Sequence, residues 1–192
     1  MQKVWLNPYW AGKKPPCAVI ADRDGTLIEH VDYLSKPSQM KLIEGVRETL
    51  EFLKQQHIPL FVHTNQSGVG RGYFSLEELV QCQDTLWQLL EIPRETLGGW
   101  AVAPEKPSEA GPYRKPSPRF IKEVAEHLQI PVERVFMVGD AMVDLETAWN
   151  AGAQAIAVQT GKAESNASEI SKPFHALNRF LEIKALIKKA VN

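Results

Sequence analysis

The chain has 192 residues, of which 44% are apolar and 23% are charged, and its formal net charge is −1. This length and composition are typical of one globular domain with a sizeable hydrophobic core. The balanced charge argues against a broad basic surface for nucleic acid or anionic lipid.

Cys17 and Cys82 are the two cysteines, and they lie far apart in the sequence. Two cysteines at this spacing make neither a disulfide framework nor a metal-binding motif, so we expect a reduced, cytoplasmic compartment. No apolar run approaches the length of a membrane span, and the N-terminus lacks the apolar core of a signal peptide. A membrane partner is therefore not expected.

Residues 1–16 are read as an aromatic N-terminal arm, and residues 17–192 as a single domain. Trp5, Tyr9 and Trp10 make the arm unusually rich in rings. The simpler interpretation is that these rings pack on the surface of the domain. The alternative is a contact between two copies of the chain, or a clamp at the entrance of a site.

Short apolar runs alternate with amphipathic segments along the chain, which is typical of right-handed crossovers in a parallel sheet. We expect an α/β fold with a doubly wound, Rossmann-like parallel sheet of about five or six strands, helices on both faces and no separate cap domain. The predicted strands are Ala18–Ala21, Leu60–His63, Trp100–Ala103, Val135–Val138 and Ala155–Val158, with a weaker one near Phe174–Ala176.

The segments between these runs carry helix signals. Two connections, Gly25–Glu44 and Pro104–Arg114, are longer than usual and are expected to overhang the carboxyl edge of the sheet as lids. The predicted helices are Val46–Leu53, a segment opened by a capping box at Ser75, a segment with Pro118 as its first residue, Asp144–Ala151, and about Asn178–Val191.

Asp22 and Asp24 directly follow the first predicted strand. Two acids two residues apart on an extended segment share an orientation, and ligands of open α/β sheets bind at this end of the strands. Such a pair suits chemistry in which one carboxylate attacks and another carries a proton. The alternative is a strand that ends in an ordinary Asx turn.

Polar clusters also follow three later strands. Thr64–Gly68 offers a hydroxyl, amides and backbone N–H groups for an anion, although loops are rich in such residues. Arg114 and Lys115 can hold a phosphate, although a solvated basic turn is the simpler reading of one such pair. Asp140 and Asp144 can complete a Mg²⁺ site, although an acid at a helix start also suits the dipole. Because parallel strands deliver these groups to one edge, the set predicts phosphate chemistry with a hard cation.

Over about residues 18–162, these motifs taken in order resemble those of the haloacid dehalogenase-like superfamily of aspartyl-phosphate phosphatases. The runs Thr64-Asn-Gln-Ser-Gly-Val-Gly-Arg-Gly and Arg114-Lys-Pro are similar to the capless branch, which includes heptose-1,7-bisphosphate 7-phosphatases and histidinol-phosphatases. The other motifs that carry the resemblance are Asp22-Arg-Asp-Gly-Thr, Lys115 and Gly139-Asp-Ala-Met-Val-Asp.

The resemblance implies a Mg²⁺-dependent phosphomonoesterase. Asp22 would attack phosphorus and become an aspartyl phosphate, while Asp24 would protonate the leaving oxygen and then activate water. Mg²⁺ would be bound by the carboxylates of Asp22 and Asp140 and by the backbone carbonyl of Asp24. Asp144 would support this metal site from behind the ligands.

The resemblance also implies how substrate is held. Thr64 and Lys115 would bind the transferring phosphoryl group, and the leaving group would belong to a small phosphorylated metabolite, foremost a heptose bisphosphate. The side chains implied to contact substrate are Asn65, Ser67, Arg114, His30 and Tyr33.

Two departures from the heptose enzymes fall on the leaving-group side. Those enzymes carry a Cys/His zinc cluster before the Arg-Lys pair, but residues 103–113 contain neither cysteine nor histidine, so no zinc is expected. Those enzymes also place a substrate-binding lysine after the metal-binding aspartate, where this chain has Ala141. The departures leave the chemistry intact and weaken only the substrate assignment.

Other readings remain open. Val69-Gly-Arg-Gly and Tyr113-Arg-Lys-Pro also look like polynucleotide 3′-phosphatases, although the balanced charge argues against a nucleic-acid partner. A histidinol-phosphatase is a further alternative. A receiver-like switch shares an acceptor Asp, a Thr and a Lys but has no need of the second acid, and a non-catalytic scaffold ranks last. We expect a monomer or a weak homodimer.

Overall fold

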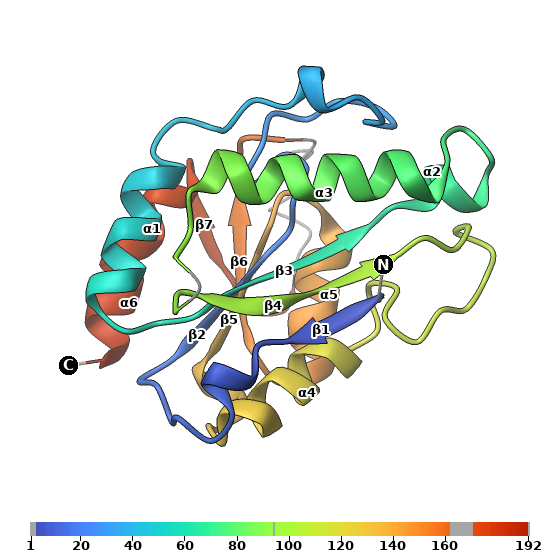
Figure 1. Ribbon diagram of the computed structural model, residues 1–192. Coiled ribbons are helices and arrows are strands. Elements are labelled where there is room, and N and C mark those ends of the chain that lie inside the picture. Colours follow the sequence, from blue (N-terminus) through green and yellow to red (C-terminus); the bar gives the residue numbers. More distant parts are fainter. Residues whose placement is uncertain (1–2, 94, 162–170, 192) are drawn as a thin grey trace.

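The computed structural model describes residues 3–93, 95–161 and 171–191. It contains a seven-stranded sheet in the order β1-β4-β3-β2-β5-β6-β7 (Figure 1). Every neighbouring pair of strands is parallel except β1 and β4. The strands are β1 (Val4–Leu6), β2 (Ala18–Ala21), β3 (Leu60–Asn65), β4 (Leu97–Ala103), β5 (Val135–Gly139), β6 (Gln154–Val158) and β7 (His175–Leu177).

Helices cover both faces of the sheet. In Figure 1, α3 crosses one face, and α4 and α5 lie on the other. The helices are α1 (Val46–Gln55), the short α2 (Ser67–Gly70), α3 (Leu76–Leu90), α4 (Arg119–Leu128), α5 (Met142–Ala151) and α6 (Ile183–Val191).

The central strand β2 shows how the two layers form. Val19 and Ala21 pack in a cluster with the buried residues of α1, α3 and α6, whereas Ala18 and Ile20 pack in a second cluster with α4 and α5. Successive side chains of a strand point to opposite faces, so a strand buried on both faces must be apolar throughout. The run Ala18–Ala21 therefore sits at the middle of the sheet, with its carboxyl end free to carry polar groups.

The predicted fold class is confirmed, and the structure adds detail at the edges. The sheet has seven strands instead of five or six: the weaker strand predicted near Phe174–Ala176 is present as β7, and β1 is a further strand that was not expected. Strands this short at a sheet edge give too few residues for a periodic pattern. Helix starts also differ from those predicted: Pro118 is the N-cap of α4, α5 begins at Met142, and a 3₁₀ turn, Phe180–Glu182, precedes α6.

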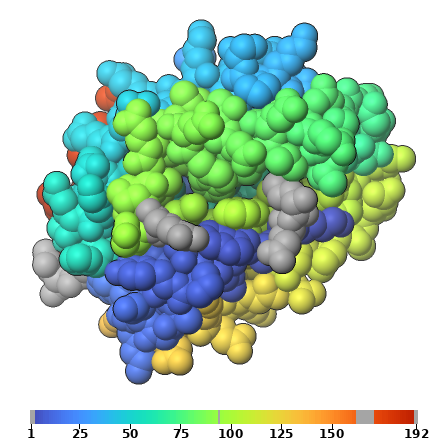
Figure 2. All heavy atoms as spheres, in the orientation of Figure 1, coloured from blue at the N-terminus to red at the C-terminus, as the bar shows by residue number. Residues whose placement is uncertain are grey.

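The aromatic arm packs against the domain. β1 pairs antiparallel with β4, and the ring of Trp5 lies 4.6 Å from that of Trp100 between centroids. Trp10 is 5% exposed and belongs to the α4–α5 core cluster, while Tyr9 remains 47% exposed. In Figure 2 the arm (blue) lies between α3 and β4 (green) and α4 (gold).

The contact between β1 and β4 depends on Gly99. Its φ is +149°, and an added Cβ would lie 2.2 Å from the backbone oxygen of Trp5. We expect Gly99→Ala to lower the free energy of unfolding by about 1–3 kcal/mol, because β1 would have to move away. Gly72→Ala is the matched control, since Gly72 also has a positive φ (+73°) but open space around it. Urea unfolding of both variants tests this, and equal losses would contradict the role of the close approach.

Candidate active site

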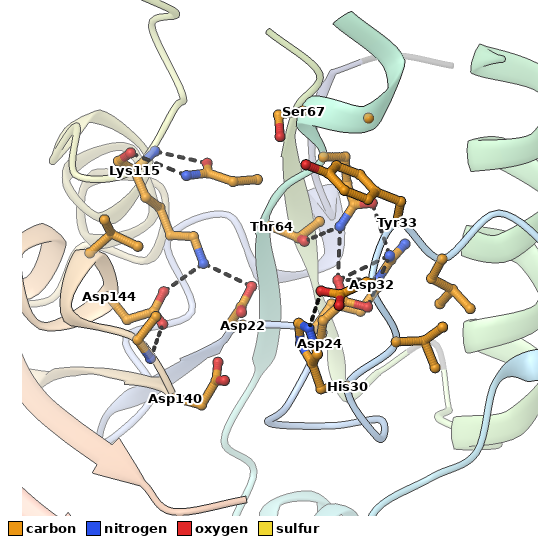
Figure 3. A pocket seen from close by; sticks show the side chains of 18 of the residues that line it. Asp22, Asp24, His30, Asp32, Tyr33, Thr64, Ser67, Lys115, Asp140 and Asp144 are labelled. Carbon is orange, nitrogen blue, oxygen red and sulfur yellow. Dashed lines mark hydrogen bonds and ion pairs between the residues drawn. The ribbon is translucent and has the colours of Figure 1, made fainter. Parts of the chain in front are cut away.

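A cavity of about 310 Å³ opens at the carboxyl ends of β2, β3 and β5. Residues 30–34 of the first predicted lid, Gly25–Glu44, line it, whereas residues 104–113 of the second do not. Figure 3 shows the charged side chains of the cavity pointing toward one another. The lining consists of residues 22–24, 30–34 and 64–68, with Phe74, Lys115, Asp140, Ala141, Val143 and Asp144.

Lys115 sits at the centre of the buried charges. Its Nζ lies 2.8 Å from Oδ1 of Asp22 and 2.5 Å from Oδ1 of Asp144, and it is 4% exposed. Burial alone would lower the pKa of Lys115, but the carboxylates of Asp144 and Asp22 outweigh it and raise the pKa. The ammonium is therefore charged at neutral pH and available to a phosphoryl group.

Three carboxylates meet beside this lysine. Asp22, Asp140 and Asp144 each offer an oxygen, and these oxygens all lie within 4.8 Å of one another. Burial raises the pKa of Asp22 to about 7, with the charges of Asp144 and Asp24 adding to it and Lys115 opposing it. Because the carboxylates outnumber the ammonium, a divalent cation would balance the charge, and hard oxygen donors are those that Mg²⁺ prefers.

Glycines give Asp140 and Asp144 room to approach. A Cβ on Gly139 would lie 2.1 Å from the carboxyl group of Asp144, and one on Gly161 would lie 1.8 Å from Oδ2 of Asp140. Asp144 stands in the first turn of α5, where its Oδ2 accepts a hydrogen bond from the backbone N–H of Ala141 at 3.1 Å. Asp144 therefore both caps the start of α5 and lines the cavity.

Asp24 lies on the side of Asp22 that faces away from Lys115 (Figure 3), and two neighbouring side chains hold it. The guanidinium of Arg23 donates to both carboxylate oxygens of Asp24 at 3.1 Å. The amide of Gln66 donates to Oδ2 of Asp24 at 2.9 Å and to the hydroxyl of Thr64 at 2.8 Å. The predicted acid–base group and the predicted phosphoryl-binding hydroxyl thus share one hydrogen-bond donor.

The end of β3 holds the segment that carries Lys115. The side-chain amide of Asn65 donates to the carbonyl of Lys115 at 3.1 Å and accepts from its backbone N–H at 3.0 Å. Earlier in the same strand, Nε2 of His63 donates to the carbonyl of Tyr113 at 2.7 Å. Burial, with the charge of Lys115, lowers the pKa of His63 to about 3, so this imidazole is a neutral, fixed donor.

The remaining predicted contacts are divided between the cavity and its surroundings. Ser67, His30 and Tyr33 line the cavity, with Nε2 of His30 3.1 Å from Asp32 Oδ1 and the ring of Tyr33 4.6 Å from that of Tyr73. Arg114 does not line it, and its Nη1 donates to the carbonyl of Glu105 at 2.8 Å. The structure therefore brings together every predicted catalytic and metal-binding residue but leaves Arg114 outside.

The chain is similar to several known proteins. A family model described as HAD-hydrolase-like matches residues 112–183. The chain is 37% identical over 161 residues to the D-glycero-beta-D-manno-heptose-1,7-bisphosphate 7-phosphatase of Haemophilus ducreyi, covering 79% of this chain and 86% of that protein. The chain belongs to the haloacid dehalogenase-like family. The enzyme of the same name from Pseudomonas putida is 36% identical over 147 residues, covering 76% of this chain and 84% of that relative.

A solved structure supports the fold of this haloacid dehalogenase-like chain. The D,D-heptose 1,7-bisphosphate phosphatase of B. bronchiseptica, whose crystal structure is complexed with magnesium and phosphate, superposes with a TM-score of 0.78 at 24% identity. The match covers 90% of this chain and 98% of that one. The two curated relatives, at 36% and 37% identity, confirm the predictions of a family member and of a phosphatase enzyme.

Sequence reasoning gave no role to Arg23 and Gln66, although both stand inside motifs of the haloacid dehalogenase-like family. Alternation along a strand places Arg23 on the face opposite its two acidic neighbours, which usually means solvent. Here that face is closed, and Arg23 is 0% exposed and Gln66 6%. The available signal was a charged residue at the tip of a strand buried on both faces, because such a residue must find a buried partner.

Proposed function

We propose that this protein is a Mg²⁺-dependent phosphomonoesterase that acts through an aspartyl phosphate on a small phosphorylated metabolite, foremost a sugar bisphosphate. The observation that carries the proposal is the buried group formed by Asp22, Asp140, Asp144 and Lys115 beside the cavity. Such a group combines a candidate nucleophile, a cation for the phosphoryl oxygens and oxygen ligands for a hard metal ion.

In the first half-reaction, a carboxylate oxygen of Asp22 attacks phosphorus and the bond from phosphorus to the leaving oxygen breaks. Asp24 gives its proton to that oxygen, so the alcohol departs neutral. Lys115 and the hydroxyl of Thr64 bind the phosphoryl oxygens and stabilise the charge that they carry in the transition state. The product of this step is the aspartyl phosphate on Asp22.

In the second half-reaction, a water molecule attacks the same phosphorus. Asp24, now a carboxylate, accepts a proton from the water, and the bond from phosphorus to the oxygen of Asp22 breaks. Inorganic phosphate leaves, and both aspartates return to their starting forms. One residue therefore serves as acid and then as base, which requires its carboxyl group to keep one position through both steps.

The acidic group fits Mg²⁺. The carboxylates of Asp22 and Asp140 would hold the ion, with the backbone carbonyl of Asp24, and Asp144 would support them through Lys115. When bound, the ion would neutralise charge on the phosphoryl oxygens and offset repulsion between the dianion and the attacking carboxylate. No zinc is expected in the segment before Lys115, and this stays a prediction.

The substrate proposal rests on the relatives, which are named for a heptose 1,7-bisphosphate. A panel of that bisphosphate, histidinol phosphate and a 3′-phosphorylated oligonucleotide would test it, with the sugar bisphosphate expected to give the highest kcat/KM.

No helix among the described residues has the length and apolar character that crossing a bilayer requires. A cytoplasmic monomer or weak homodimer is part of the proposal.

Removing divalent cations with EDTA is expected to lower phosphate release on the order of 100-fold or more, because such an ion contributes several kcal/mol to phosphoryl transfer. Adding Mg²⁺ should restore release of many equivalents of phosphate per chain from p-nitrophenyl phosphate. Metal analysis of the purified protein should find no stoichiometric zinc. One equivalent of phosphate that stays bound would instead support the receiver-like switch, and full activity in EDTA would contradict a metal enzyme.

A further inference from the structure

Arg23 and Gln66 surround the carboxyl group of Asp24 with donors. Three hydrogen bonds reach its two oxygens, two from Arg23 and one from Gln66. A carboxylate has about four acceptor positions, so roughly one remains open. The side chain of Asp24 is 16% exposed, whereas that of Arg23 is fully buried, so the open position faces the cavity rather than the interior.

Gln66 ties this arrangement to the phosphoryl pocket. Its amide nitrogen donates to both Asp24 and Thr64, and its Oε1 accepts a hydrogen bond from Arg23 at 2.9 Å. Figure 3 labels Thr64 and Asp24, the two side chains that Gln66 links. Gln66 therefore stands between the acid–base carboxyl group and the phosphoryl-binding hydroxyl.

The arrangement is a poor device for stability alone. Arg23 is 0% exposed, and its Nη1 has no hydrogen-bond partner in the described structure. A buried donor without a partner destabilises the folded state, and a buried ion pair is weak evidence for stabilisation. The guanidinium is thus placed where it serves the orientation of Asp24 at some expense in stability.

We propose that Gln66 and Arg23 are positioning residues that hold the carboxyl group of Asp24 in line for proton transfer to the leaving oxygen. The inference rests on the proposed function and assigns to these two side chains a part of its first half-reaction. As the bond from phosphorus to the leaving oxygen breaks, the proton passes from Asp24 to that oxygen. Efficient transfer requires the carboxyl group to point at the leaving oxygen while the bond to phosphorus breaks.

The consequence is a dependence on the leaving group. A nitrophenolate departs without a proton, whereas a more basic phenolate needs one. Loss of orientation at Asp24 should therefore harm esters of basic alcohols and spare those of acidic ones. A purely structural loss would lower the rates for all esters alike.

The experiment measures kcat/KM for p-nitrophenyl, p-chlorophenyl and phenyl phosphate, with Mg²⁺ present, in the wild type and in Gln66→Met. kcat/KM reports the steps up to release of the phenol and excludes the second half-reaction. We expect a loss of about 10–100-fold for phenyl phosphate and less than about threefold for p-nitrophenyl phosphate, because misplacement costs rate only where the proton is needed. In an Asp24→Asn background, Gln66→Met should change neither value further.

Matched variants separate positioning from folding. Gln66→Asn keeps an amide but shortens the side chain. Arg23→Lys keeps the charge but loses the paired N–H donors of the guanidinium. Both variants should reproduce the leaving-group dependence. Gln83→Met makes the same change at a buried glutamine of α3 outside the cavity and should change no rate. Equal losses on all three esters, or additivity with Asp24→Asn, would overturn the positioning role alone. A wild type inactive on every ester would overturn the proposed function together with it.

Discussion

Asp22→Asn is expected to abolish phosphate release, with a loss on the order of 10⁶-fold, as for removal of other covalent nucleophiles. An amide oxygen does not form the bond to phosphorus, and the acidic group around Lys115 loses one of its three carboxylates. Rapid acid quench should find no phosphate bound to the protein. The measurement is phosphate release from p-nitrophenyl phosphate at saturating Mg²⁺.

The fold of Asp22→Asn should survive. Because burial raises the pKa of Asp22 to about 7 in the folded, metal-free protein, its ionised form is disfavoured there, and stability falls as pH rises from about 4 to 7. Replacing the carboxylate by a neutral amide removes this cost, so the metal-free variant should unfold at a temperature no lower than that of the wild type. Asp84→Asn, at an exposed position of α3, is the control that should leave activity intact. Substantial hydrolysis by Asp22→Asn would place the nucleophile elsewhere.

Asp24→Asn is expected to lower kcat/KM for phenyl phosphate by about 10²–10⁴-fold, the usual contribution of a positioned general acid. Asparagine retains the shape of the side chain and can still accept from Arg23 or Gln66, but it has no proton to transfer at neutral pH. The loss for p-nitrophenyl phosphate should be smaller, because its leaving group departs as an anion.

Two measurements accompany this variant. Affinity for Mg²⁺ should stay close to that of the wild type, since the proposed contribution of Asp24 to the metal is its backbone carbonyl. Phosphate bound to the protein should accumulate with p-nitrophenyl phosphate, because the water of the second half-reaction has lost its base. A rate near that of the wild type on phenyl phosphate would remove Asp24 from the acid–base role.

The catalytic motifs are accessible to sequence reasoning because each lies directly after a buried strand. The acid pair after β2, Thr64 at the end of β3 and Asp140 after β5 can be assigned to one sheet edge from their order along the chain. The carboxyl ends of parallel strands meet at one edge, so local position predicts spatial proximity. Contacts made by loops have no such rule, and Arg114 turns to the carbonyl of Glu105 instead of the cavity.

The sequence by itself determined the fold class, the family resemblance and the residues proposed for the chemistry. Apolar runs, the helical spacing of apolar residues and acids at strand ends are local properties. They can be recognised in a short segment without knowing how the rest of the chain folds. Only the tertiary structure decided that β1 joins the sheet, that Arg23 is buried, and that one amide of Gln66 reaches both Asp24 and Thr64. Those features depend on which surfaces are closed by segments distant in sequence, and burial of a charge by distant segments leaves no periodic mark along the chain.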